Sequence, residues 1–175
     1  MAQLTTIPRD ADKGVGGLCA VWLANKADLT VAVDNSTGYT SFTPVDDVSV
    51  HTLFTKFVMT KETSNFTTTG TGTPTAGTTS YNQTLTMVFA RNEALKRNQV
   101  YQMGKAELVA VVKDRNGDAW CLGNDECNGL DMTSSTGTSG TGPNDLSGQT
   151  IVLSGNFKYP ESFVTDASLA DITNE

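Results

Sequence analysis

Alternation of apolar and polar residues over short segments most limits what this chain can fold into. The clearest case is YNQTLTMVF at residues 81–89, where Tyr81, Gln83, Leu85, Met87 and Phe89 occupy every second position. Successive side chains of a β-strand point to opposite faces, so these five residues share one face of a predicted strand. The same reasoning, applied to apolar or alternating segments bounded by turn residues, predicts strands at residues 17–25, 27–34, 105–114, 118–123 and 149–157.

Composition supports a fold made mainly of strands. Threonine occupies 27 of the 175 positions and glycine 16, and only 18% of residues are charged. Threonine favours strands and glycine favours turns. We therefore predict a mainly β protein, a β-sandwich or barrel of about seven to eight strands with one flanking α-helix. Residues 1–160 are predicted as a single β domain and residues 161–175 as an acidic C-terminal tail that is disordered or laid on another surface.

Two Ser/Thr/Gly-rich segments are predicted as extended loops, residues 67–80 and 133–148. Before the first of them, residues 48–69 form a long β-branched segment with apolar residues on both faces, which predicts one long strand, bent or bulged in its middle. This strand and residues 81–89 are expected to form a β-hairpin with a long, flexible tip.

One helix is predicted, over residues 91–103. Asn92 is a candidate N-cap and Gly104 is placed to end the helix. The expected apolar stripe consists of Ala94, Leu95, Tyr101 and Met103.

The segment VVKDRNGDAWCLGNDECNGLDM, residues 111–132, raises the question of a metal or redox site. Asp114, Asn116 and Asp118 alternate as in a calcium loop, but Ala119 stands at the sixth position, where such a loop needs glycine. Cys121 and Cys127 lack a second pair of ligands for zinc.

The same segment contains two Asn-Gly steps. Asn116-Gly117 lies between two predicted strands, and this dipeptide is typical of a type I′ hairpin turn. Asn128-Gly129 repeats the signal. We therefore interpret the segment as consecutive tight turns, with Cys121 as a small buried side chain.

No residue pattern predicts an enzyme. His51, the only histidine, lies within a strand pattern, and neither glycine-rich segment matches a phosphate-binding loop. The net charge of −7 argues against a nucleic-acid binder of the basic-patch kind. We expect no catalytic residue, cofactor or metal. Residues 1–14 contain no apolar run, so we expect no secretory signal, synthesis in a cytoplasm and no membrane partner.

The order of these segments resembles tail-tube-type virion proteins of bacteriophages, including phages of Bacteroides and its relatives. The resemblance begins with KGVGGLCAVWLANKADLT and continues with TTTGTGTPTAGTTSYNQTLTMVF and the helix. It ends with VVKDRNGDAWCLGNDECNGLDM and TGPNDLSGQTIVLSG, followed by a proline. It implies a non-enzymatic structural protein of the virion tail or neck, made in the host bacterial cytoplasm.

The resemblance also implies an assembly. Such proteins form rings by joining sheets edge to edge, and a long hairpin reaches the next ring. The implied role is a homo-oligomeric ring of the tail tube or of the head–tail neck, in contact with other tail, neck or portal proteins. Phage DNA would pass through its lumen without sequence-specific binding during ejection. We expect the Thr/Gly segment to order on a neighbouring subunit, with these candidate oligomer-interface residues: Thr69, Thr71, Thr73, Thr75 and Thr78.

Other readings stay open beside this one. The net negative charge suggests a lumen lined by acidic or neutral residues that repels phosphate. The alternative function is a β-sandwich adhesin or glycan-binding module of a virion appendage. Against it, exposed aromatic residues are usual at such sites, and aromatics make up only 7% of the chain.

Overall fold

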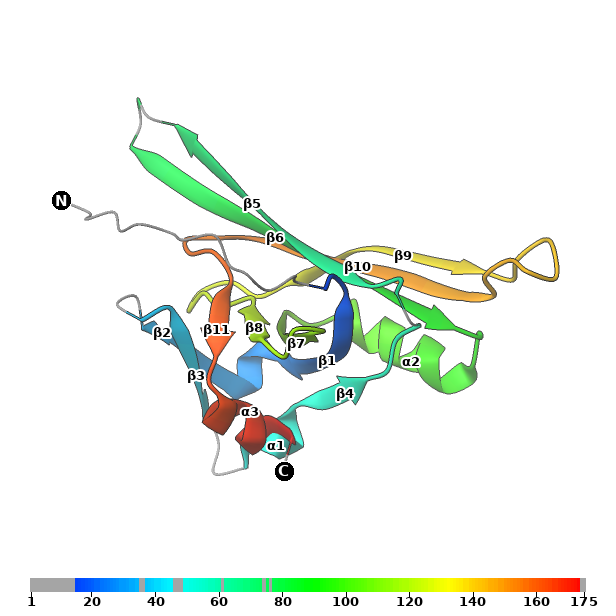
Figure 1. Cartoon of the computed structure of the whole chain (residues 1–175), viewed down its shortest axis with the longest axis horizontal. Helices are drawn as coiled ribbons and strands as arrows, with labels where there is room; N and C mark the ends of the chain where they lie inside the picture. Colours follow the sequence, from blue (N-terminus) through cyan, green and yellow to red (C-terminus); the bar gives the residue numbers. More distant parts are fainter. Residues whose placement is uncertain are drawn as a thin grey trace.

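Two β-sheets face each other across a hydrophobic core (Figure 1). The computed structural model describes residues 15–34, 37–45, 49–60, 62–73, 75 and 77–173. One sheet has seven strands in the order β2-β3-β11-β8-β7-β1-β4, and the other has four in the order β5-β6-β10-β9. The prediction of a mainly β sandwich is confirmed, although the described residues contain eleven strands and three α-helices where fewer were expected.

The strands of the larger sheet are β1 (Leu18–Asn25), β2 (Leu29–Asp34), β3 (Tyr39–Pro44), β4 (Thr55–Phe57), β7 (Leu108–Asp114), β8 (Ala119–Leu122) and β11 (Ser162–Val164). The smaller sheet consists of β5 (Asn65–Thr73), β6 (Thr78–Ala90), β9 (Asp131–Thr138) and β10 (Gly148–Phe157). The helices are η1 (Lys26–Asp28, a 3-10 turn), α1 (Val50–Leu53), α2 (Ala94–Met103) and α3 (Asp166–Thr173).

The central strands of the larger sheet are buried on both faces, which explains the continuous apolar runs of β1 and β7. Val21 and Val112 point into the core between the two sheets, whereas Trp22 and Val111 point into a second core on the opposite face. A strand covered on both sides needs apolar residues at every position rather than at alternate ones. Helices α1 and α3 lie over the second core (Figure 1).

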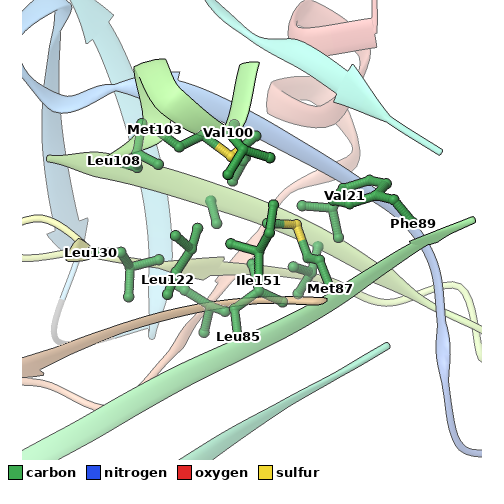
Figure 2. Close-up of a cluster of buried hydrophobic side chains, with 14 of the residues drawn as sticks. Val21, Leu85, Met87, Phe89, Val100, Met103, Leu108, Leu122, Leu130 and Ile151 are labelled. Carbon is green, nitrogen blue, oxygen red and sulfur yellow. The ribbon is translucent and has the colours of Figure 1, made fainter. Parts of the chain in front are cut away.

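The core between the sheets is closed at one end by α2. Figure 2 shows Leu85 and Met87 of β6 and Ile151 of β10 meeting Val100 and Met103 of α2. The predicted face of β6 is confirmed, because Gln83, Leu85, Met87 and Phe89 are buried and Tyr81 is half-buried.

The single long strand predicted for residues 48–69 is wrong. This segment contains α1, β4 and β5, and it passes from one sheet to the other because β4 pairs with β1 while β5 pairs with β6. Phe54 packs in the second core, 5.4 Å from the ring of Phe42, whereas Phe57 packs against the first. Apolar residues on both faces therefore reflect two cores, not one strand.

Helix α2 lies within the predicted range, but Met103 is the one residue of the predicted apolar stripe that is buried. Gly104 ends it, as expected, while its N-cap position is Glu93 rather than Asn92. Val100 and Met103 are buried, but Leu95 is 70% exposed and Tyr101 is 60% exposed. The helix touches the core mainly through its last turns, so its first turn presents apolar surface to solvent.

The predicted acidic tail contributes to the fold instead. Strand β11 pairs with β8 on one side and, in parallel, with β3 on the other. Helix α3 follows and buries Leu169 and Ile172, whose spacing of three places them on one face of a helix. Burial of this apolar face holds the segment on the body, while the carboxylates of Asp166 and Asp171 remain exposed to solvent.

A buried amide group links the two sheets. The Gln83 side chain of β6 accepts a hydrogen bond from Gly123 N (2.9 Å) and donates to Asn124 Oδ1 (3.1 Å) and Tyr159 O (3.1 Å). Asn124 in turn donates to Pro160 O (2.7 Å) and to Ser162 Oγ (3.1 Å). Each end of this network belongs to a different sheet, so the network fixes how β6 lies over β8 and β11.

Replacing Gln83 with leucine is expected to lower the free energy of unfolding by about 2–4 kcal/mol, because three buried polar groups lose their partner. The measurement is urea unfolding followed by circular dichroism. The matched control is Gln102→Leu on the exposed side of α2, with an expected change within about 0.5 kcal/mol. Equal stability of the two variants would contradict the structural role of the amide.

Candidate assembly surface

Strands β5 and β6 form an arm that projects beyond the body of the sandwich (Figure 1). They pair without interruption from Asn65 opposite Thr86 to Thr73 opposite Thr78. The predicted hairpin is therefore present, but most of the predicted loop at residues 67–80 is paired strand. Strand β9 likewise replaces the first part of the loop predicted at residues 133–148.

All five candidate interface threonines are exposed on this arm. Thr69, Thr71 and Thr73 alternate along β5 and share one face, which also carries Thr78, the residue opposite Thr73. Thr75 lies in the turn that joins the strands, next to residues 74 and 76, which are outside the described part. The structure thus groups four of the five side chains on one surface, and their role in an interface stays a prediction.

An aromatic residue covers a glycine within the arm. Gly70 lies directly opposite Tyr81, and a Cβ atom at Gly70 would be 3.2 Å from the tyrosine ring. An aromatic side chain that covers a strand glycine compensates for the side chain the glycine lacks. The arm therefore has a contact of its own, outside the main core.

The outer face of the four-stranded sheet is rich in hydroxyl groups and carries one charged residue, Asp131, which lies opposite Ser154. Side chains that point away from the core pair across strands, as Thr84 Oγ1 does with Ser154 Oγ at 3.2 Å. The acidic residues of the chain therefore lie almost entirely outside this sheet.

Both edges of the four-stranded sheet are open in the described part of the chain. Strand β5 pairs only with β6, and β9 pairs only with β10. Nearly every residue of β9 is exposed. Open edges of this length promote association with another strand, and monomeric proteins usually block them.

Residues 114–118, the candidate calcium loop of the sequence, form a turn around the carboxylate of Asp114. Asp114 Oδ1 accepts hydrogen bonds from Asn116 N and Asp118 N, both at 2.9 Å. Gly117 has a φ of +102°, but Asn116 has no positive φ, so the predicted type I′ geometry is wrong. The β7–β8 hairpin itself is confirmed.

The second Asn-Gly step does not form a hairpin. It lies on the crossing from β8 in one sheet to β9 in the other. Gly129 is needed for close approach, because a Cβ atom there would be 2.9 Å from Glu107 Cβ and 3.0 Å from Leu108 O. The next residue, Leu130, exchanges backbone hydrogen bonds with Leu108.

The cysteines occupy unlike environments. Cys121 is fully buried, as the sequence predicted, and burial raises the pKa of its thiol to about 12. Cys19 and Cys127 are exposed, and all three are free. Lys26 lies near Cys121 and binds the carbonyl oxygen of Asp125, and burial lowers the pKa of its ammonium group.

Other potential sites were checked within the described residues. No group of three or more His, Cys, Asp or Glu side chains is placed to hold a metal ion there. His51 lies in α1 rather than in a strand. None of the helices in the described part is long and apolar enough to cross a membrane.

A row of aromatic rings crosses the larger sheet and reaches β5. Tyr39, Phe163, Trp120 and Phe66 follow one another with ring centroids 6.1, 4.0 and 5.9 Å apart. Tyr39 and Phe163 are partly exposed. Phe163 packs closely on Trp120, whereas Tyr39, which is 45% exposed, keeps ring surface open to solvent.

The sequence did not reveal the open edge at β9 or the exposed first turn of α2. A run of small polar residues, DMTSSTGT, forms β9, and its backbone pairing rather than its side chains makes it a strand. The near-absence of charge in residues 65–90 and 131–157 was the available signal.

No protein-family model and no curated protein matches the sequence. Among solved structures, a chain of the "Virion of native gene transfer agent (GTA) particle" shares 11% identity with this one. The alignment covers 81% of this chain and 98% of that chain, with a TM-score of 0.37. A likeness at this TM-score supports no argument about the fold or the function of this protein.

We expect two of the three thiols to react with a water-soluble disulfide reagent in the native protein, because Cys121 is inaccessible and its thiolate is scarce. The third should react only after unfolding in denaturant. Thiol titration by absorbance, with C121S as the control, measures both numbers. Rapid native reaction of all three would show that the second core opens readily.

Proposed function

We propose that this protein is a non-enzymatic structural component of a phage virion that forms a ring in the tail tube or the head–tail neck. The observation that carries the proposal is the four-stranded sheet, which combines an outer face that has a single charged residue, Asp131, with two edges that are open among the described residues. The sequence resemblance to tail-tube-type proteins points the same way. Other tail, neck or portal proteins are the proposed neighbours of the ring.

Strand directions permit closure of a ring. The three pairs within the four-stranded sheet are all antiparallel, so β5 and β9 run in opposite directions. In a ring with rotational symmetry, copies set side by side keep their orientation, and β9 of one copy would meet β5 of the next in antiparallel fashion. The sheets would then continue from copy to copy with the same pairing that they use internally.

The proposed lumen wall is the outer face of this sheet. A hydroxyl-rich wall without lysine or arginine offers no cation to the DNA phosphates, so the genome would slide without being held. The sequence led us to expect a lumen lined by acidic or neutral residues, and in this proposal the lining is neutral except for Asp131. The arm would reach beyond its own ring toward the next one.

The first test is the assembly state, measured by sedimentation velocity and negative-stain imaging. A ring or tube supports the proposal, whereas a stable monomer or trimer that binds glycans would favour the adhesin hypothesis. A matched pair of variants, Ser135→Pro and Thr136→Pro, then probes the β9 edge. Adjacent N–H groups of an edge strand point to opposite sides, so one proline removes an outward donor and the other a bond to β10.

We expect the proline variant that keeps the parent's thermal midpoint to remain monomeric, since only its contact with a neighbour is lost. Its partner variant should lose thermal stability, because proline removes a hydrogen bond within the sheet. Rings formed equally well by the thermally stable variant would rule out β9 as a joining edge.

The arm is tested by replacing Thr71–Ser80 with Asn-Gly. The two residues form a tight turn between Gly70 and Tyr81, which already lie opposite each other. We expect a folded subunit that forms rings but does not stack them, seen as single rings rather than tubes. Loss of the folded state would mean that the arm stabilises the domain itself.

A further inference from the structure

An apolar groove lies between β4, the end of β6 and the first turn of α2. Its volume is about 310 Å³, and its walls include Phe57, Val58, Phe89 and Leu95. Val58 is 81% exposed and Leu95 is 70% exposed. Two such side chains beside one groove are unusual for surface that remains in water.

One ammonium group borders the groove. Lys96 belongs to its walls, and none of the described wall residues is acidic. Lys56 is the other lysine of the walls, but its Nζ lies over the Trp22 ring of the second core, 5.5 Å from the ring centroid. Lys96 Nζ donates to Ala90 O at 2.6 Å and lies 3.7 Å from Glu93 Oε2, which holds the ammonium group near the opening. The groove therefore suits an apolar side chain that is accompanied by a carboxylate.

The loop after β9 carries that combination. Leu146 is 37% exposed, a large apolar side chain in a loop that is otherwise small and polar. Its neighbour Asp145 accepts hydrogen bonds from Gly142 N at 2.7 Å and Thr141 N at 2.9 Å, and these bonds lower the pKa of the exposed carboxyl. The Asp145 carboxylate is thus fixed in place beside Leu146.

The register of the sheet places the loop and the groove at the same end. Strand β9 ends at Thr138, opposite Gly148, which is itself opposite Ala90 at the end of β6. Strand β5 starts near this end, with Asn65 opposite Thr86. Just before β5, the Thr60 N–H binds Val88 O at 2.8 Å, which brings the Val58 wall of the groove to the β5 side of the sheet.

We propose that Leu146 of one copy fills the groove between β4 and α2 of the next copy in the ring, with Asp145 beside Lys96. This contact rests on the proposed function, since it requires β9 of one copy to lie along β5 of its neighbour. The apolar contact supplies affinity, and the opposite charges select this register over shifted ones.

Cross-linking tests the contact directly in the full chain. In a C19S/C127S background, cysteines replace Leu146 and Leu95, and a short bismaleimide is added to assembled rings. We expect ladders of covalently linked subunits on denaturing gels. The matched control pairs Leu146→Cys with Tyr101→Cys, an exposed α2 position outside the groove, and should give few ladders.

A second measurement uses Leu146→Asp, which is expected to raise the concentration for half-maximal ring assembly by about tenfold or more, as for loss of an interface anchor. Ser139→Asp adds the same charge to the same loop and should assemble like the parent. Subunit folding is checked by thermal denaturation of both variants.

The possible results separate the two proposals. A parent protein that forms no rings overturns the proposed function and this contact with it. If the parent forms rings, only the groove contact is overturned when rings of the variant with cysteines at positions 146 and 95 give no ladders. The same holds when the control variant with cysteines at positions 146 and 101 gives equal ladders. Leu146→Asp rings that assemble like those of Ser139→Asp also overturn only the groove contact.

Discussion

The hydrogen bonds of Gln83 are the constraint on which the two-sheet arrangement depends. This side chain lies fully buried in β6 and binds the chain just after β8 and just before β11. Apolar packing between the sheets is compatible with many relative positions, whereas an amide with three partners is satisfied in only one. The direction in which β6 leaves the body, and hence the direction of the arm, follows from that position.

This arrangement separates two kinds of surface. The larger sheet is covered on both faces at its central strands β1 and β7 and provides the body of the molecule. The smaller sheet has one covered face, one polar face whose single charged residue is Asp131, and two edges without a partner strand among the described residues. The whole chain contains 27 threonines, which favour strands. Because the strands of the smaller sheet carry few charges, this sheet has little affinity for polyanions. The proposed ring uses each of these properties: the edges to join copies, the polar face as a wall and the arm as a link.

Local patterns predicted the elements whose burial follows a simple rule. The alternation in residues 81–89 identified the inner face of β6, and the β7–β8 hairpin was found from its apolar strands and Asn-Gly turn. The prediction of one long strand over residues 48–69 was wrong because the apolar residues of this segment pack in two different cores. The prediction of an acidic tail over residues 161–175 was based on its acidic residues, whereas the packing of this segment depends on Leu169 and Ile172. The candidate threonines were correctly expected to be exposed, but as paired strand rather than loop.

The sequence by itself determined the fold class, the scarcity of reactive side chains and the low charge of the Thr/Gly segments, because these depend on composition and on spacing along the chain. Only the tertiary structure decided which strands share a sheet, which edges remain open and where Leu95, Val58 and Leu146 stay exposed. The physical reason is that sheet order and exposed edges arise from contacts between residues far apart in the chain, such as β3 with β11, and no local period encodes such pairing.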